Sequence, residues 1–122
     1  MKDEQGFTLI ELLFSLLIFG VAAAAMTTAF AQMQQRNWSF EVKSGAIGAA
    51  QQVLDNLRVQ DPTTMPTSGT TSQTVTYGSR TFTVATRYCS VSTYCTSNNI
   101  RHIRVTTTYL GTEYYQVDTV YA

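Results

Sequence analysis

Apolar residues follow two patterns along the chain: a continuous run near the N-terminus and a period-two alternation in the second half. The run extends over residues 7–31 and contains one charged residue, Glu11. Because roughly 20 predominantly apolar residues cross a bilayer, this run predicts a transmembrane helix. A carboxyl group inside such a segment costs roughly 2.5–3.5 kcal/mol on insertion scales, which marks Glu11 as a functional candidate. The plainer alternative is a glutamate that merely lies near the membrane interface.

Helical periodicity continues past the run, so the same helix is predicted to extend through residues 32–60. Its second half is amphipathic, which allows one side to pack against a sheet. The apolar stripe comprises Phe40, Ile47, Ala50, Leu54 and Leu57, and the opposite face carries Glu41, Lys43, Gln51, Gln52, Asp55 and Arg58. Gly20, Gly45 and Gly48 each cost roughly 1 kcal/mol relative to alanine, so they are predicted points of bending or melting. Asp61-Pro62 is predicted to end the helix.

The second half of the chain ends in a predicted antiparallel sheet. A loop rich in Thr and Ser covers residues 62–73, and alternating segments follow at 74–77, 80–89, 100–110 and 113–121. Gly78-Ser79 and Gly111-Thr112 separate them as hairpin turns. The residues expected to face the helix are Phe82, Val84, Ile103, Val105, Tyr109, Tyr115, Val117 and Tyr121. The predicted fold class is therefore α+β: a long N-terminal α-helix, with a transmembrane half and an amphipathic half, packed on a small four-stranded antiparallel sheet over residues 61–122.

The segment Gly6-Phe7-Thr8-Leu9-Ile10-Glu11-Leu12 resembles the class III signal of type IV prepilins and pseudopilins. The resemblance implies a leader over residues 1–6, which a prepilin peptidase removes between Gly6 and Phe7, and N-methylation of the new terminus at Phe7. It also implies that Glu11 pairs with the methylated amine of Phe7 in a neighbouring subunit. The leader departs from the family pattern, because it has one lysine and two acidic residues where most leaders are net basic.

An ordinary secretory signal is the alternative at the level of processing. Such a signal has a basic start, an apolar core of about 7–15 residues and a small-residue cleavage site after that core. Here the alanines at 22–25 lie inside the apolar run, and a cut there would separate Glu11 from the mature protein. The product would then be a free periplasmic domain without the apolar helix.

Residues 46–58 are similar to the helix of PilV-type minor pilins and of minor pseudopilins of type II secretion. This resemblance implies a low-copy subunit that primes or caps a filament, with a small major pilin as the alternative. The implied partners are other major and minor pilins, the prepilin peptidase and N-methyltransferase, and the inner-membrane assembly platform. The implied location is the inner membrane before assembly, as a single-pass protein with its C-terminal domain in the periplasm, and a pilus or pseudopilus afterwards.

The two cysteines, Cys89 and Cys95, have five residues between them. In an exported domain this spacing favours one disulfide, which the chain-entropy model values at roughly 2–3 kcal/mol before strain. Two free thiols are the next alternative. A metal site is disfavoured because two thiolates need two further ligands, and His102 is the single histidine. No cofactor or metal is expected.

Charge limits the remaining functions. The formal net charge is zero, so no global field attracts nucleic acid. Locally, no acidic residue lies between positions 61 and 113, and strand parity puts Arg87, His102 and Arg104 on one solvent face. This patch is a candidate contact for DNA phosphates in a competence pilus, with Tyr88 and Tyr94 stacking on bases. The plainer alternatives are a sheet surface kept soluble by arginines, or a contact with another subunit.

Catalytic groups do not assemble in this sequence. It offers no nucleophile–base–acid set and no glycine-rich phosphate loop. The sequence therefore predicts a structural protein that is the substrate of a processing enzyme rather than an enzyme itself.

Overall fold

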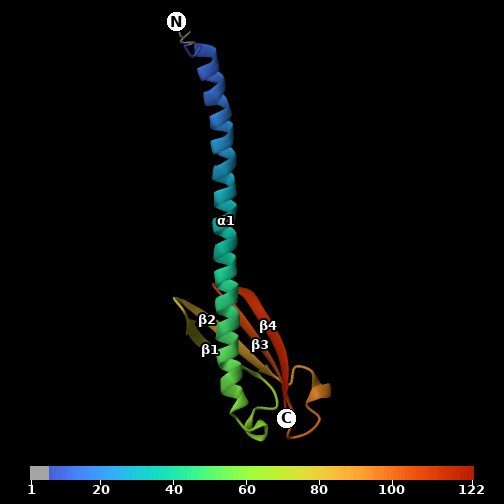
Figure 1. Cartoon of the computed structure of the whole chain (residues 1–122). Coiled ribbons are helices and arrows are strands. Elements are labelled where there is room, and N and C mark those ends of the chain that lie inside the picture. Colours follow the sequence, from blue (N-terminus) through green and yellow to red (C-terminus); the bar gives the residue numbers. More distant parts are fainter. Residues whose placement is uncertain (1–5) are drawn as a thin grey trace. The chain divides into compact units, whose positions relative to one another are not determined.

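The computed structural model describes residues 6–122, and its elements confirm the predicted α+β class (Figure 1). One helix, α1, spans Leu9–Arg58. It is followed by strands β1 (Thr70–Tyr77), β2 (Arg80–Tyr88), β3 (Arg101–Tyr109) and β4 (Thr112–Tyr121). The chain divides into two compact units, Met1–Trp38 and Ser39–Ala122. The leader expected over residues 1–6 lies, apart from Gly6, outside the described residues.

The two ends of α1 have distinct local causes. At the start, the carbonyl oxygen of Thr8 accepts the backbone N–H groups of Glu11 and Leu12 at 3.1 and 3.2 Å. At the end, α1 stops at Arg58, two residues before the predicted boundary at residue 60. Asp61 then caps a short 3₁₀ turn, since its Oδ1 accepts the N–H of Thr63 at 2.9 Å. This hydrogen bond holds the pKa of Asp61 below its usual value.

The sheet covers a different stripe of α1 from the predicted one. The buried positions are Val42, Gly45, Ala46, Gly48, Ala49, Ala50, Val53 and Leu57. Ala50 and Leu57 are therefore correctly predicted, whereas Ile47 and Leu54 are only half-buried. The prediction for Phe40 is wrong, because its side chain is 79% exposed. The physical reason is that the sheet approaches the helix closely, so small side chains lie inside and the large ones lie at the border or outside it.

Two of the glycines in α1 make this close approach possible. The helix is continuous through Gly20, Gly45 and Gly48, so the structure does not show the predicted melting at these positions. A Cβ built on Gly45 would lie 2.7 Å from the buried ring of Phe82 on β2. A Cβ on Gly48 would overlap the ring of Tyr77 on β1. These glycines are sites where aromatic rings of the first hairpin pack on the helix backbone.

This packing gives a matched pair of expected stabilities. Gly45→Ala is expected to lower the unfolding free energy, because overpacking against fully buried Phe82 costs about 1–3 kcal/mol while helix propensity returns about 1 kcal/mol. Gly48→Ala is expected to be neutral or stabilising, because Tyr77 is 48% exposed and its ring can swing outward. Thermal unfolding of both full-length variants in detergent tests the difference. Equal unfolding temperatures would contradict it.

The four strands form one antiparallel sheet in the order β1-β2-β3-β4. Both predicted hairpins are confirmed, and β2 also pairs with β3, so the sheet is a simple meander. The predicted loop over 62–73 is wrong at its end, because Thr70–Gln73 belong to β1. The second turn is centred on Leu110-Gly111 rather than Gly111-Thr112, with positive φ at both residues as a two-residue type I′ turn requires.

The core of the second unit lies between the sheet and the second half of α1. All eight strand residues predicted to face the helix belong to this core or pack against it, which confirms the predicted strand parity. The edge strand β4 is tied to the helix by the Tyr121 hydroxyl, which donates to the Leu54 carbonyl at 3.1 Å. Partial burial of this hydroxyl raises the pKa of Tyr121.

Candidate assembly and processing site

The predicted cleavage bond lies immediately before the helix. Gly6, Phe7 and Thr8 are outside α1, and Phe7 is exposed. A peptidase needs an accessible bond, and residues 6–8 are exposed and precede the helix. The roles assigned to Gly6 and Phe7 in cleavage and methylation remain predictions.

Glu11 lies in the first turn of α1, four residues after Phe7. The positive end of the helix macrodipole stabilises an acidic side chain at this position. Its backbone carbonyl accepts the Ser15 hydroxyl at 2.8 Å, so Ser15 bonds back along its own helix. Thr27 and Thr28 do the same with the carbonyls of Ala23 and Ala25. These bonds satisfy hydroxyl groups internally, as an apolar environment demands.

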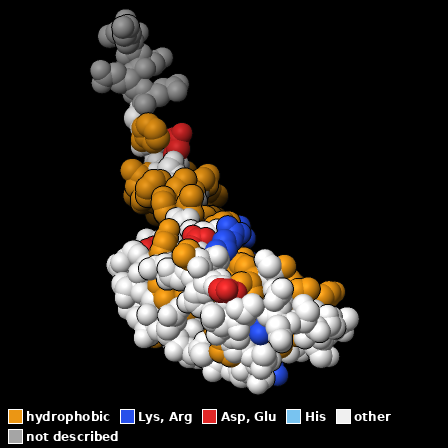
Figure 2. All heavy atoms as spheres, turned by 90° about the horizontal axis from the view of Figure 1, so that it is seen from below, with side chains coloured by type: hydrophobic (Ala, Val, Ile, Leu, Met, Phe, Trp, Pro, Cys, Tyr) orange, Lys and Arg blue, Asp and Glu red, His pale blue; other side chains and the backbone are white. Residues whose placement is uncertain are grey.

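Apart from Glu11, residues 7–31 of the N-terminal unit form a predominantly apolar, exposed surface. Among the described residues, α1 is the helix that is long and apolar enough to cross a membrane. Its large apolar side chains are exposed from one end of the run to the other, and Figure 2 shows hydrophobic side chains gathered along it. Such a surface requires lipid or other helices as its environment. Glu11 is therefore the single charged residue on this apolar surface.

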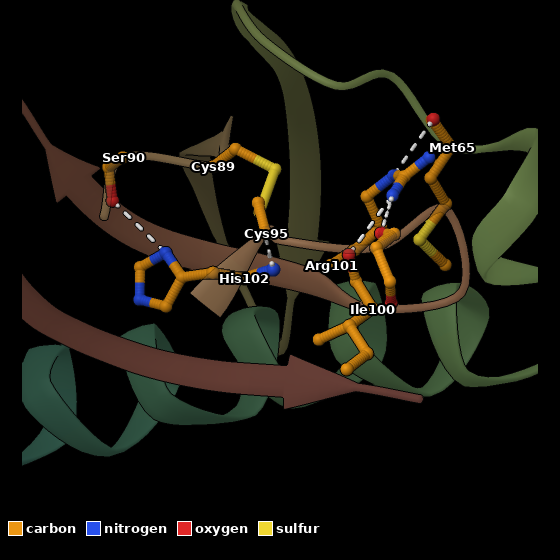
Figure 3. Close-up of a disulfide and its surroundings, with 8 residues drawn as sticks. Met65, Cys89, Ser90, Cys95, Ile100, Arg101 and His102 are labelled. Carbon is orange, nitrogen blue, oxygen red and sulfur yellow. Dashed lines mark hydrogen bonds between the residues drawn. A yellow bond between two sulfur atoms is a disulfide. The ribbon is translucent and has the colours of Figure 1, made fainter. Parts of the chain in front are cut away.

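The disulfide Cys89–Cys95 is present and closes a small loop after β2 (Figure 3). The prediction that His102 lies at the surface is wrong, because this residue is 3% exposed. The closed loop folds over it: Ser90 Oγ lies 3.2 Å from His102 Nδ1, and the Tyr94 ring stacks on the imidazole with centroids 5.9 Å apart. Strand parity alone could not reveal this cover, since the covering residues come from the loop.

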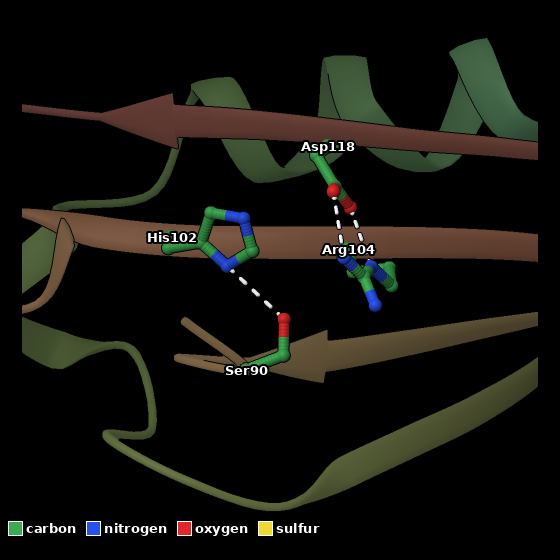
Figure 4. Close-up of polar contacts among 4 residues, drawn as sticks. All are labelled: Ser90, His102, Arg104 and Asp118. Atoms are coloured by element: carbon green, nitrogen blue, oxygen red, sulfur yellow. Dashed lines mark hydrogen bonds and ion pairs between the residues drawn. The ribbon is translucent and has the colours of Figure 1, made fainter. Parts of the chain in front are cut away.

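Arg87 and Arg104 do lie on the same face, directly opposite each other in the β2–β3 register. Arg104, however, is paired with Asp118 of β4 through two hydrogen bonds of 2.7 and 2.8 Å (Figure 4). Tyr88 is buried on the helix side of the sheet, and the Tyr94 ring stacks on the His102 imidazole. The structure therefore does not bring Arg87, His102 and Arg104 together as one free cationic patch, and the support for a DNA contact is reduced to Arg87.

The Arg104–Asp118 pair gives an expected pH dependence. The guanidinium of Arg104 holds the pKa of the Asp118 carboxyl below its ordinary value near 3.8. The stabilisation is therefore complete above the unfolded-state pKa and is lost as pH falls through the lower folded-state pKa. Urea unfolding of the wild type and of Asp118→Asn is expected to differ at pH 7 and to converge at acidic pH. A difference that persists below pH ~2 would contradict this assignment.

Arg101 is a buried arginine that the sequence pattern did not reveal. Its guanidinium donates to the carbonyl oxygens of Met65, Ser97 and Ile100 at 3.4, 3.1 and 3.0 Å. It thereby joins the loop before β1 to the loop before β3 (Figure 3). A second ion pair, Arg80–Glu41 at 2.6 Å, connects β2 to α1 and raises the pKa of Arg80. The Arg101–Met65 contact and the Arg80–Glu41 pair have no signal in the local sequence, because these partners are 36 and 39 residues apart.

Comparisons with known proteins match two parts of the sequence. Residues 1–27 match the family model described as the prokaryotic N-terminal methylation motif. The chain is similar to the type II secretion system protein I of Pseudomonas aeruginosa, with 38% identity over 69 residues. The aligned part covers 57% of this chain and 52% of that relative, so the chain spans about half the length of the curated relative it matches. No solved structure matches the chain significantly. The N-terminal methylation motif, the apolar helix that follows it and the similarity to a type II secretion protein together support the predicted resemblance to type IV pilins and pseudopilins.

Proposed function

We propose that the chain is a low-copy structural subunit, a minor pseudopilin, of a type II secretion filament. The observation that carries the proposal is Glu11, a lone carboxylate in the first turn of an exposed apolar helix that follows the Gly6-Phe7 bond. The similarity to a type II secretion protein favours secretion over other filaments. The second candidate is a minor type IV pilin that primes or caps a pilus, which the resemblance of residues 46–58 supports.

Processing is proposed to occur at the accessible bond before the helix. The prepilin peptidase cuts between Gly6 and Phe7, which leaves Phe7 as the first residue of the mature chain. Methylation of the new amine preserves its positive charge. The mature protein therefore begins with a cation, followed within one helical turn by the carboxylate of Glu11.

Assembly is proposed to use these two charges across subunits. Unpaired, each would be costly in an apolar environment, because burying a single ion carries a penalty of several kcal/mol. Pairing the Glu11 carboxylate with the Phe7 amine of the neighbouring subunit removes most of that penalty and sets the axial register. The surrounding apolar side chains exchange lipid for helix contacts, and the small residues of the run allow close helix approach.

The proposed location follows from the same features. Before assembly, the helix holds the chain in the inner membrane in a single pass, with the sheet unit in the periplasm. The disulfide Cys89–Cys95 suits that oxidising compartment. The proposed partners are other major and minor subunits, the processing peptidase and methyltransferase, and the assembly platform.

Disruption of the gene in its own host tests the choice of filament. Loss of exported enzymes from the medium, restored by the full-length chain, is the expected result. Normal secretion together with loss of surface pili would instead support the second candidate. Loss of DNA uptake alone would support a competence pilin.

A further inference from the structure

Strand β1 leaves one edge of the sheet open. It is the outermost strand in the order β1-β2-β3-β4, and it pairs with β2 without interruption from Thr70↔Arg87 to Tyr77↔Arg80. Within residues 6–122, its other side has no neighbouring strand. Figure 1 shows β1 at the margin of the sheet. The backbone groups on that side are available to another chain.

The register identifies which groups these are. Tyr77 and Arg80 flank the two-residue turn, and the Tyr88 N–H donates to the Gly69 carbonyl at 2.9 Å. Residues with the parity of 69 and 77 therefore bond to β2, because hydrogen-bonded positions alternate in an antiparallel pair. The N–H and C=O groups that face the open edge belong to Thr70, Ser72, Thr74 and Thr76.

This edge lacks the usual protection against pairing. Natural edge strands are blunted by charged residues, proline, bulges or short length. The eight residues of β1 include no charge, no proline and no glycine, and seven of them are exposed. The opposite edge, β4, carries Glu113 and Asp118 and begins beside a register irregularity at Thr107/Thr108. Of the two edges, β1 is the one suited to strand addition.

An apolar groove lies beside this edge within the same unit. Its apolar lining comes from Phe40 and Ile47 of α1 and Tyr77 of β1, together with Gly48, and its volume is about 620 Å³. The polar part of its lining comprises Ser39, Lys43, Ser44 and Gln51. Phe40, predicted to be in the core, instead projects into solvent here. It belongs to a repeat with an apolar residue at every seventh position of α1: Leu12, Phe19, Met26, Met33, Phe40, Ile47 and Leu54. Residues at seven-residue spacing return to nearly the same side of a helix, with a drift of about 20° per repeat.

We propose that the open edge of β1 and the Phe40–Ile47–Tyr77 groove together form the docking surface for another pilin-type subunit of the same polarity. That subunit adds an edge strand to β1 and lays its N-terminal helix against the groove. This rests on the proposed function, since subunits that assemble through parallel N-terminal helices share one polarity. In a four-stranded meander the first and last strands run in opposite directions, so a β4-like strand of such a neighbour meets β1 antiparallel.

The charges on the outer face complement this arrangement. Thr70, Arg87, Arg104 and Asp118 form one row across the four strands. The row has a cation, Arg87, next to the open edge and a carboxylate at the far edge. A neighbour with this fold, added edge to edge, places a carboxylate on the same outer face as Arg87, two strands away from it.

Proline at Thr74 tests the edge without disturbing the hairpin. The Thr74 N–H faces outward, so Thr74→Pro removes a donor to the partner and none to β2. Thr74→Val is the matched control, because it retains the N–H and a similar volume. A photoreactive side chain at residue 76 of the full-length chain in host membranes is expected to cross-link a subunit whose N-terminus is an N-methylated phenylalanine. The cross-link is expected to fall about tenfold in Thr74→Pro and to persist in Thr74→Val.

The groove is tested by Phe40→Gln, with Val59→Gln as its control. Both wild-type side chains are exposed, at 79% and 88%, but Val59 lies outside the groove. Cross-linking is expected to fall about tenfold only in Phe40→Gln. If Thr74→Pro lowers the unfolding temperature, Thr74→Lys replaces it. This variant keeps the N–H donor but adds a charge to the edge, and the same loss of cross-linking is expected.

Unchanged cross-linking in folded Thr74→Pro and Phe40→Gln, or a cross-linked protein without a pilin-type N-terminus, would overturn the inference. Glu11→Ala separates this inference from the proposed function. If Glu11→Ala abolishes filament incorporation while the edge and groove variants assemble normally, the proposed function stands and the docking surface is wrong. If Glu11→Ala also assembles normally, the proposed function fails.

Discussion

The Glu11→Ala variant is expected to be cut after Gly6 and to remain in the membrane, yet to be missing from filaments. The carboxylate is the single charge on the apolar part of α1, and its proposed partner is the Phe7 amine of the next subunit. Removing one member of a buried ion pair leaves the other uncompensated, at a cost of about 3–5 kcal/mol. That cost corresponds to more than about a hundredfold loss of incorporation. Immunoblots of sheared filaments and membranes measure the distribution.

Val59→Gln is the control for this prediction. Val59 follows α1, lies outside the apolar run and is exposed. Incorporation of this variant is expected to equal that of the wild type. Glu11→Ala at wild-type level in sheared filaments would contradict the role assigned to the carboxylate, whatever the state of the membrane fraction.

Arg101→Met is expected to lower the free energy of unfolding more than substitution of an exposed arginine does. The side chain is 3% exposed, and its guanidinium holds carbonyl groups from two loops. Methionine fills much of the volume but leaves those carbonyls without a donor. Because a hydrogen bond to a charged group contributes about 1.5–3 kcal/mol, we expect a loss of about 2–4 kcal/mol. Urea unfolding of the full-length protein in detergent measures it.

Arg104→Met provides the comparison for Arg101→Met. The two arginines lie on the same strand but on opposite faces of the sheet. Arg104 is partly exposed on the outer face, and its partner Asp118 is exposed there too. Exposed pairs of this kind contribute little, so a much smaller loss of stability is expected. Equal losses of unfolding free energy in the two variants would show that burial does not determine the contribution of Arg101 to stability.

Local signals in the sequence predict the element types well. The apolar run, the proline at 62 and the turn residues act over a few positions each, and the helix and hairpins follow them. The face of α1 that packs on the sheet is predicted less accurately. Two apolar stripes overlap in residues 40–57, and their large side chains suggested the stripe with Phe40. The sheet instead packs on the small residues, because Gly45 and Gly48 let Phe82 and Tyr77 approach.

The candidate functional residues also fall into a group defined by local sequence and a group defined by tertiary contacts. The residues from Gly6 to Glu11 form a contiguous motif, so their roles can be inferred without any tertiary contact. The charges of the sheet unit depend on partners far along the chain. Asp118 neutralises Arg104 from a neighbouring strand, and a disulfide-closed loop covers His102. Neither partner is close to its target in the sequence, so strand parity placed these side chains on the right face but in the wrong environment.

The most direct test of the account is the intact mass and N-terminal sequence of the mature protein from membranes and from sheared filaments. The account predicts a chain that begins at N-methylated Phe7 in both fractions, with the disulfide intact. A chain that begins beyond the alanines at 22–25, found only in the periplasm, would contradict it, because such a product lacks both Glu11 and the helix through which assembly is proposed.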